Sequence, residues 1–261
     1  MQQQLNIALI QSNLIWENPG QNRKIFSKKI FAIKEPIDVM VLPEMFSSGF
    51  TMNPEHVSET MQGETVTWMK EMAAKSNAAI CGSLVISEGG HCFNRFVFAT
   101  PKGHIETYDK RHTFTLAGEQ KVYKAGNNRL VINYKGWKIM PLVCYDLRFP
   151  VWARNTDNYD VLIYVANWPK PRINAWDALL KARAIENMSY CIGVNRIGFD
   201  NNNHEYSGHS AVYDGLGECI TSIAPNAEQV EVVTIKKNHI ETIRQKLKFL
   251  DDKDEFTFYS S

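Results

Sequence analysis

Short runs of Val, Ile, Leu and aromatic residues, each bounded by turn residues, recur along the chain and predict β-strands. The runs at 38–42, 137–143 and 161–166 are apolar almost throughout, which is typical of strands buried on both faces. The predicted helices are 21–34, 64–75, 174–187 and 237–248, and the predicted strands are 5–11, 38–42, 79–86, 92–99, 130–134, 137–143, 161–166, 191–195, 210–213 and 230–234. This alternation indicates an α/β fold with helices covering a mixed sheet.

The length and charge of the chain limit the number of domains and the kinds of binding partner that we expect. A chain of 261 residues without an internal repeat or linker fits one domain, residues 1–261. Its 29 basic and 28 acidic side chains leave no positive excess for binding nucleic acid. No window is apolar enough to span a membrane, and the N-terminus lacks the pattern of a signal peptide. We therefore expect a cytoplasmic protein that binds neither membrane nor nucleic acid.

The five cysteines and seven histidines do not form a recognisable metal or disulfide pattern. The cysteines are odd in number and scattered, and they include no C-x-x-C pair. The histidines show neither H-x-x-x-H nor H-E-x-x-H spacing. We therefore expect no disulfide framework and no metal.

Three strand-like runs end in side chains that together can carry out chemistry. Glu44 follows the run at 38–43, Lys110 follows the run at 104–109, and Cys144 follows the apolar run at 139–143. A thiol with a pKa near about 8.5 needs a base or a nearby positive charge to react at neutral pH. Glu44 is the candidate base, while Lys110 and the backbone N–H of Tyr145 are candidate donors to an oxyanion. Taken singly, each residue also fits a purely structural role.

Three segments resemble the signature segments of the nitrilase superfamily of carbon-nitrogen hydrolases. They are Leu-Pro-Glu at 42–44, Tyr-Asp-Lys-Arg-His at 108–112 and Val-Cys-Tyr-Asp-Leu-Arg-Phe-Pro at 143–150. The resemblance implies a four-layer α-β-β-α sandwich, with Glu44 as general base, Lys110 as oxyanion stabiliser and Cys144 as nucleophile. It also implies a second acid, Glu119, which orients Lys110 or assists proton transfer; the alternative is a purely structural salt bridge to Lys110. No cofactor is implied.

The segment at 164–172 and the helical stretch at 182–187 resemble the omega-amidase branch of this superfamily. The resemblance implies hydrolysis of the terminal amide of a short 2-oxo dicarboxylic acid monoamide, such as 2-oxoglutaramate, through a thioester. Such a small-molecule amide substrate carries a carboxylate, and a guanidinium binds a carboxylate with two parallel hydrogen bonds. Arg172 is the first candidate for this contact and Arg196 the second.

Aromatic residues near these candidates are expected to form the walls of the pocket. They are Tyr145, Trp168 and Phe114. Asp146 and Arg148 follow the cysteine so closely that we expect them to anchor its turn rather than to contact substrate.

Other functions and the assembly of the chain remain open at this point. A carbamoylase or an aliphatic nitrilase would use the same residues, whereas a glutaminase-like site would combine Cys144 with His204 and Glu205. A third alternative is a non-catalytic interaction protein that keeps the sandwich. The polar stretch 199–205 is expected to be a surface loop. The superfamily commonly forms dimers, so we expect the aromatic tail at 249–261 to lie in a homodimer contact.

Overall fold

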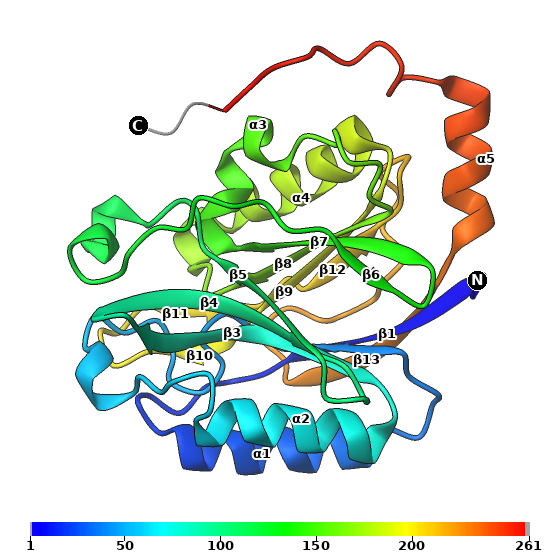
Figure 1. Cartoon of the computed structure of the whole chain (residues 1–261). Coiled ribbons are helices and arrows are strands. Elements are labelled where there is room, and N and C mark those ends of the chain that lie inside the picture. The colour runs from blue at the N-terminus through cyan, green and yellow to red at the C-terminus, as the bar shows by residue number, and fades with distance from the viewer. Residues whose placement is uncertain (1, 259–261) are drawn as a thin grey trace.

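The computed structural model describes residues 2–258, which fold into two β-sheets packed face to face between helices (Figure 1). The six-stranded sheet has the order β13 (Gln229–Lys236), β1 (Gln4–Gln11), β2 (Val39–Val41), β3 (Ala79–Glu88), β4 (His91–Ala99) and β5 (Ile105–Asp109). The five-stranded sheet has the order β12 (Ala211–Tyr213), β9 (Tyr190–Asn195), β8 (Val161–Ala166), β7 (Trp137–Val143) and β6 (Ile132–Tyr134).

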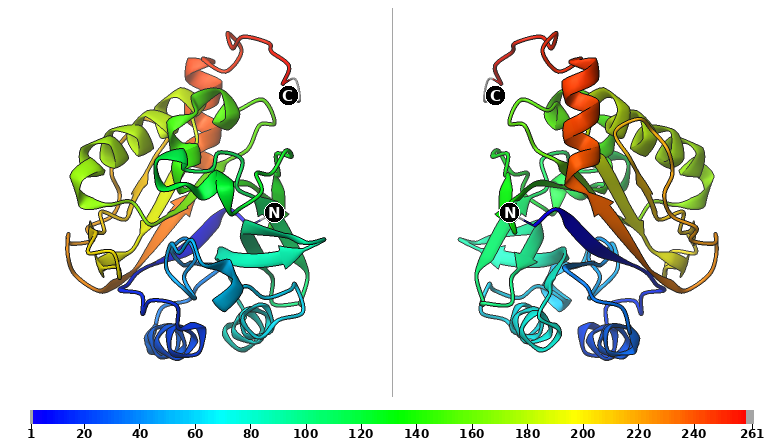
Figure 2. Two further views of the ribbon diagram at one scale, coloured as in Figure 1. Left: turned by 90° about the vertical axis from the view of Figure 1, so that its left-hand side faces the viewer. Right: turned by 90° about the vertical axis from the view of Figure 1, so that its right-hand side faces the viewer.

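Helices cover the outer face of each sheet. Helices α1 (Pro19–Ala32) and α2 (Glu64–Ser76) lie on the six-stranded sheet, and α4 (Ile173–Asn187) lies on the five-stranded sheet beside the short α3 (Pro150–Ala153), as Figure 2 shows from both sides. Helix α5 (Lys237–Leu247) follows β13 along the edge. The predicted four-layer α-β-β-α sandwich is confirmed. None of these helices, within residues 2–258, is long and apolar enough to cross a membrane.

The central strands are buried on both faces, which explains their nearly continuous apolar sequences. In β1, Ile7 and Leu9 belong to the core between the two sheets, whereas Ala8 and Ile10 belong to the core beneath α1 and α2. The neighbouring strand β2 is completely buried as well. Apolar residues at every position are therefore required here, as expected for strands that have packed layers on both sides.

The ends of the helices follow from local sequence. Helix α1 begins at Pro19 because the Asn18 side chain accepts a hydrogen bond from the backbone N–H of Gln21 at 3.0 Å. Helix α2 ends where Asn77 adopts a left-handed conformation, with φ of 50°. The predicted helices and strands agree with the observed bounds to within two residues.

One hairpin was not predicted. Strands β10 (Ile197–Phe199) and β11 (Glu205–Ser207) pair in antiparallel fashion, so only the turn between them is a loop. The predicted loop over 199–205 is confirmed for residues 200–204, while its first and last residues belong to the two strands. Each strand has only three residues, too few to show an alternating pattern beside an Asn-rich turn.

The close approach of α4 to β9 depends on Gly193. A Cβ atom at this position would lie 2.4 Å from Leu180 Cδ1 and 2.7 Å from Trp176 Cζ2. We expect Gly193→Ala to push α4 away from the sheet and to lower the free energy of unfolding by about 1–3 kcal/mol, measured by urea denaturation. Gly20→Ala, at the open start of α1, is the matched control and should cost little. Equal stability of the two variants would contradict this account of the packing.

Candidate active site

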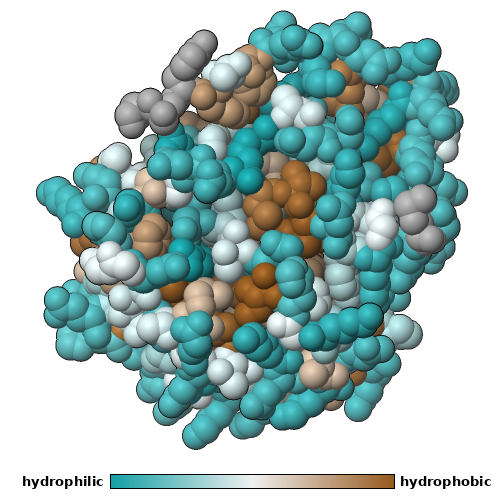
Figure 3. All heavy atoms as spheres, viewed as in Figure 1, coloured by the Kyte–Doolittle hydropathy of each residue, from teal (hydrophilic) through white to brown (hydrophobic). Residues whose placement is uncertain are grey.

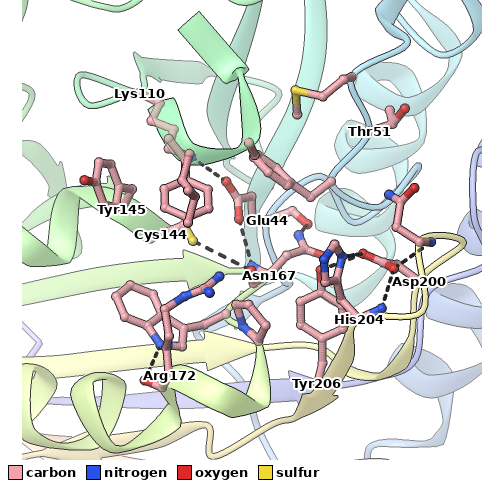
Figure 4. A pocket seen from close by; sticks show the side chains of 18 of the residues that line it. Glu44, Thr51, Lys110, Cys144, Tyr145, Asn167, Arg172, Asp200, His204 and Tyr206 are labelled. Atoms are coloured by element: carbon pink, nitrogen blue, oxygen red, sulfur yellow. Dashed lines mark hydrogen bonds and ion pairs between the residues drawn. The ribbon is translucent and has the colours of Figure 1, made fainter.

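The candidate residues converge because the strands that carry them end on the same side of the sandwich. Glu44 lies just beyond β2 of the six-stranded sheet, while Cys144 follows β7 and Asn167 follows β8 of the five-stranded sheet. Lys110 follows β5. Figure 4 shows these side chains pointing toward one another at one end of a cavity. Residues far apart in the sequence thus meet where the two sheets face each other.

The ammonium of Lys110 is held between two buried carboxylates. Its Nζ donates to Glu44 Oε1 at 2.9 Å and to both oxygens of Glu119 at 3.0 and 2.9 Å. Burial alone would lower the pKa of Lys110, but the two carboxylates outweigh it and raise this pKa above its usual value. Lys110 therefore stays protonated and supplies a fixed positive charge.

Glu119 forms the predicted ion pair with Lys110 and also accepts a hydrogen bond from the backbone N–H of Phe114. Burial raises the pKa of Glu119, and the charge of Glu44 raises it further, while Lys110 opposes both effects. Glu119 thereby connects the buried lysine to the segment that carries Phe114.

Cys144 lies on a strained turn directly after β7. Its φ of 46° is in the left-handed region, which a residue other than glycine rarely adopts. Burial raises the pKa of the Cys144 thiol, and the nearby carboxylate of Glu44 raises it further, whereas Lys110 lowers it. The thiol is therefore protonated at neutral pH, and its proton must pass to a base before the sulfur can attack a substrate.

Asp146 holds this turn in place, as predicted. Its buried carboxylate accepts hydrogen bonds from Val143 N at 3.0 Å, from Tyr108 Oη at 2.8 Å and from His112 N at 2.9 Å. The turn that carries Cys144 is in this way tied to the segment that carries Lys110.

The cavity beside the thiol has a volume of about 450 Å³, within the usual range for small-molecule sites. Four of the predicted substrate-binding residues line it, namely Tyr145, Phe114, Trp168 and Arg172. Phe114 and Tyr145 pack edge to face with ring centroids 5.0 Å apart. The cavity thus joins an aromatic wall to the cluster around Lys110.

Arg196 does not line this cavity. It is completely buried, and its guanidinium donates to the backbone carbonyls of Ile197, Leu14 and Phe199 and to the side chain of Asn13. Burial lowers its pKa. Arg196, the second candidate for the carboxylate contact, therefore has a structural role instead, because it links the β10–β11 hairpin to the loop after β1.

Arg148, unlike Arg196, lines the cavity although it was not expected to. It was expected to anchor the turn, but its side chain is exposed and lines the cavity. Its Cζ lies 4.9 Å from the ring centroid of Trp168, and the Cζ of Arg172 lies 5.3 Å from that of Phe114. Neither guanidinium forms an ion pair with the residues that the structure describes. Two cations are thus available to an anionic ligand.

The alternative site built on His204 and Glu205 is not supported by the geometry. His204 Nδ1 contacts Asp200 Oδ2 at 3.1 Å, and Glu205 forms an ion pair with Lys170 at 2.7 Å. His204 does line the cavity, but Figure 4 shows it across from Cys144, with Asn167 between them. The thiol has Glu44 and Lys110 as its charged neighbours instead.

Two asparagines of the cluster were missed. The backbone N–H of Asn167 donates to Glu44 Oε2 at 2.8 Å, and its amide donates to the backbone carbonyl of Glu44 at 2.6 Å. Asn94, in β4, donates to Glu44 Oε1 at 2.7 Å and to Glu119 Oε1 at 3.3 Å. Asn167 follows a buried strand just as Cys144 does, so its position was a usable signal. Asn94 lies inside a strand, and the only signal in the sequence was a polar side chain next to Phe93 in a largely apolar run.

This arrangement suits nucleophilic attack on a carbonyl carbon. A carboxylate stands ready to accept the thiol proton, and a fixed ammonium stands ready to stabilise negative charge that develops on oxygen. Within residues 2–258, no group of three or more His, Cys, Asp or Glu side chains is placed to hold a metal ion.

Comparisons with known proteins agree with this chemistry. The family model for carbon-nitrogen hydrolases matches residues 6–245. Omega-amidase YafV of Escherichia coli (strain K12) is 43% identical over 256 residues, covering 98% of this chain and 99% of that protein. The 2-oxoglutaramate amidase of Bacillus subtilis (strain 168) is 30% identical, covering 94% and 96%.

A solved structure shows the same fold. XC1258 from Xanthomonas campestris, a CN-hydrolase superfamily protein with an arsenic adduct in its active site, superposes with a TM-score of 0.96 at 39% identity, covering 99% of this chain and 100% of that one. Because the family model and these relatives span nearly the whole chain, the protein belongs to the carbon-nitrogen hydrolase family.

Proposed function

We propose that the protein is an omega-amidase that hydrolyses the terminal amide of short 2-oxo dicarboxylic acid monoamides such as 2-oxoglutaramate. The observation that carries the proposal is that Cys144 lines one cavity together with Glu44 and Lys110 of the buried cluster. Arg148 and Arg172, which form no ion pair within residues 2–258, line the same cavity. The likeness to an omega-amidase and to a 2-oxoglutaramate amidase over most of the chain supports the same substrate class.

In the proposed mechanism, Glu44 accepts the proton of the Cys144 thiol as the sulfur attacks the amide carbon. The Lys110 ammonium and the backbone N–H of Tyr145 stabilise the oxyanion. Glu44 then returns the proton to the leaving nitrogen, and ammonia departs to leave a thioester. Glu44 next activates a water molecule that hydrolyses the thioester to the acid and regenerates the thiol.

Substrate choice in this proposal depends on Arg172 and Arg148. A substrate that carries its amide at one end and a carboxylate at the other needs a cation one short chain away from the thiol. Both guanidinium groups line the cavity that Cys144 also lines. A carboxylate bound there gains charge-assisted hydrogen bonds, whereas a neutral amide of the same length gains none. A carbamoylase or an aliphatic nitrilase is the alternative within the family, and a panel of amides, carbamoyl compounds and nitriles separates them.

The first prediction from the proposed function concerns the nucleophile. Cys144→Ala should reduce ammonia release from 2-oxoglutaramate at least about a thousandfold, because no other group can form the thioester. Cys219→Ser removes an exposed thiol outside the cavity and serves as the matched control with normal activity. Circular dichroism should show that both variants keep the fold. Substantial turnover by folded Cys144→Ala would exclude the proposed mechanism.

The second prediction concerns the carboxylate contact. Arg172→Leu should lower kcat/KM for 2-oxoglutaramate by about 10- to 100-fold, which corresponds to the loss of a charge-assisted hydrogen bond, and should leave a neutral amide of equal length almost unaffected. Lys170→Leu removes the same charge from a neighbouring exposed position that does not line the cavity, so it should change neither substrate. The same measurement on Arg148→Leu compares the two arginines. Equal losses on both substrates would argue against a role in binding the carboxylate.

The third prediction concerns assembly, because we propose a cytoplasmic, single-domain homodimer with the tail in its contact. Phe249 is 59% exposed, and Phe258 packs on Trp152 with centroids 4.9 Å apart, so the described tail already lies on its own α3. Residues 259–261 lie outside the described part of the chain. Figure 3 shows apolar patches on an otherwise hydrophilic face. Such patches often mark interaction surfaces.

Deletion after Phe249 should halve the solution mass measured by light scattering, since it removes the apolar contacts that the tail supplies. A Lys253→Ala variant, which removes a charge from the same tail but no apolar ring, is the control and should stay dimeric. A monomeric full-length chain would overturn the proposed assembly.

A further inference from the structure

Asn94 lies at the centre of the buried cluster without an assigned role. Its side chain is 1% exposed, and its amide nitrogen is within hydrogen-bond distance of Glu44 Oε1 and Glu119 Oε1, at 2.7 and 3.3 Å. The two hydrogens of one amide group are therefore shared between two carboxylates. Lys110 is the other side chain that donates to both of them.

The orientation of this amide is fixed by hydrogen-bond logic. The backbone N–H of Met45 donates to Ser83 Oγ at 2.8 Å, and a backbone N–H can only donate. The single hydroxyl hydrogen of Ser83 then points to Asn94 Oδ1, which lies 2.7 Å away. Because Asn94 accepts through its oxygen, its NH₂ group must face the carboxylates. A flipped amide would place its oxygen against the carboxylate oxygens of Glu44 and Glu119.

The two oxygens of Glu44 consequently have different surroundings. Oε1 receives hydrogen bonds from Lys110 and from Asn94. Oε2 receives one backbone hydrogen bond, from Asn167, and so keeps an acceptor site. Asn94 and Lys110 together occupy Oε1 and leave Oε2 with the spare capacity to accept a proton.

We propose that Asn94, oriented by Ser83, is a positioning residue that fixes the rotamer of Glu44, so that Glu44 Oε2 is in position to act as the base. This inference rests on the proposed function. An amide is suited to the task because it donates two hydrogen bonds without adding charge to a cluster that already holds two carboxylates and one ammonium. An aspartate of nearly the same shape cannot donate when it is ionised, and it would bring a third negative charge.

The ionisable groups that face Glu44 and Glu119 are Lys110, Cys144 and, beside Glu119, Tyr123. None of these changes in Asn94→Asp, so any change in pH dependence comes from the new carboxylate. Like charges at this distance raise the pKa of a carboxyl group, and the protonated acid cannot serve as a base. Activity should therefore be lost at low pH sooner than in the wild type.

The experiment compares kcat, KM and the pH profile of Asn94→Asp with those of the wild type. We expect kcat to fall about tenfold or more with little change in KM, and the acid limb of kcat/KM to move up by about one pH unit. Asn155→Asp is the matched control, because Asn155 is also fully buried but its amide donates to the backbone carbonyls of Tyr159 and Asn187 instead. Its acid limb should not move. An unshifted acid limb in folded Asn94→Asp would overturn the inference.

A second variant keeps the test open if Asn94→Asp does not fold. Ser83→Ala removes the hydrogen bond that orients the amide and should lower kcat several-fold without changing KM. A purely structural role would lower thermal stability but leave kcat per folded molecule unchanged, and that result would count against the inference.

Alkylation of Cys144 by iodoacetamide as a function of pH gives a readout that needs no substrate. Mass spectrometry of the Cys144 peptide should show slower alkylation of Asn94→Asp at each pH, because added negative charge disfavours the thiolate. Absence of 2-oxoglutaramate hydrolysis by the wild type would refute the proposed function alone. Unchanged alkylation in the variant would refute the role of Asn94 alone.

Discussion

The ammonium of Lys110 is buried together with the carboxylates of Glu44 and Glu119, and the surrounding hydrogen bonds offset the cost of burying these charges. A single charge transferred into a protein interior costs several kcal/mol unless close partners compensate for it. Here every charged group has partners at 2.7–3.0 Å, including Asn94 and the backbone N–H of Asn167. The ends of β2, β5 and β8 must therefore stay in register, because a small shift of one would leave a charge unpaired.

The turn after β7 places the Cys144 thiol beside this charged cluster through an unusual backbone conformation. Cys144 holds a left-handed backbone conformation that local sterics disfavour, and hydrogen bonds from Val143, Tyr108 and His112 to Asp146 maintain it. Since burial and the nearby carboxylate raise the pKa of this thiol, the sulfur is kept unreactive until its proton can be transferred. The same neighbours that restrain the thiol include the proposed base.

The sequence predicted those features of the fold and site that depend on where buried strands begin and end. The strands and their ends were predictable, because buried strands have distinctive apolar patterns. The four-layer sandwich and the convergence of Glu44, Lys110 and Cys144 were expected from the resemblance to a known superfamily. The choice between arginines was not predictable. Arg196 turned inward to bind backbone carbonyls and Arg148 turned outward into the cavity, and both outcomes depend on tertiary packing. Asn94 was equally hidden, since its partners lie on other elements.

The two sheets contribute different parts of the cluster, with Glu44, Asn94 and Lys110 coming from the six-stranded sheet and Cys144 and Asn167 from the five-stranded one. Neither layer holds a working set of groups by itself. A loosened state in which each layer kept its hydrogen-bonded strands while the interface between them slipped would retain its secondary structure but lose its chemistry. Enzyme turnover therefore reports correct packing of the two sheets against each other more sensitively than a spectroscopic measurement of helix and strand content does.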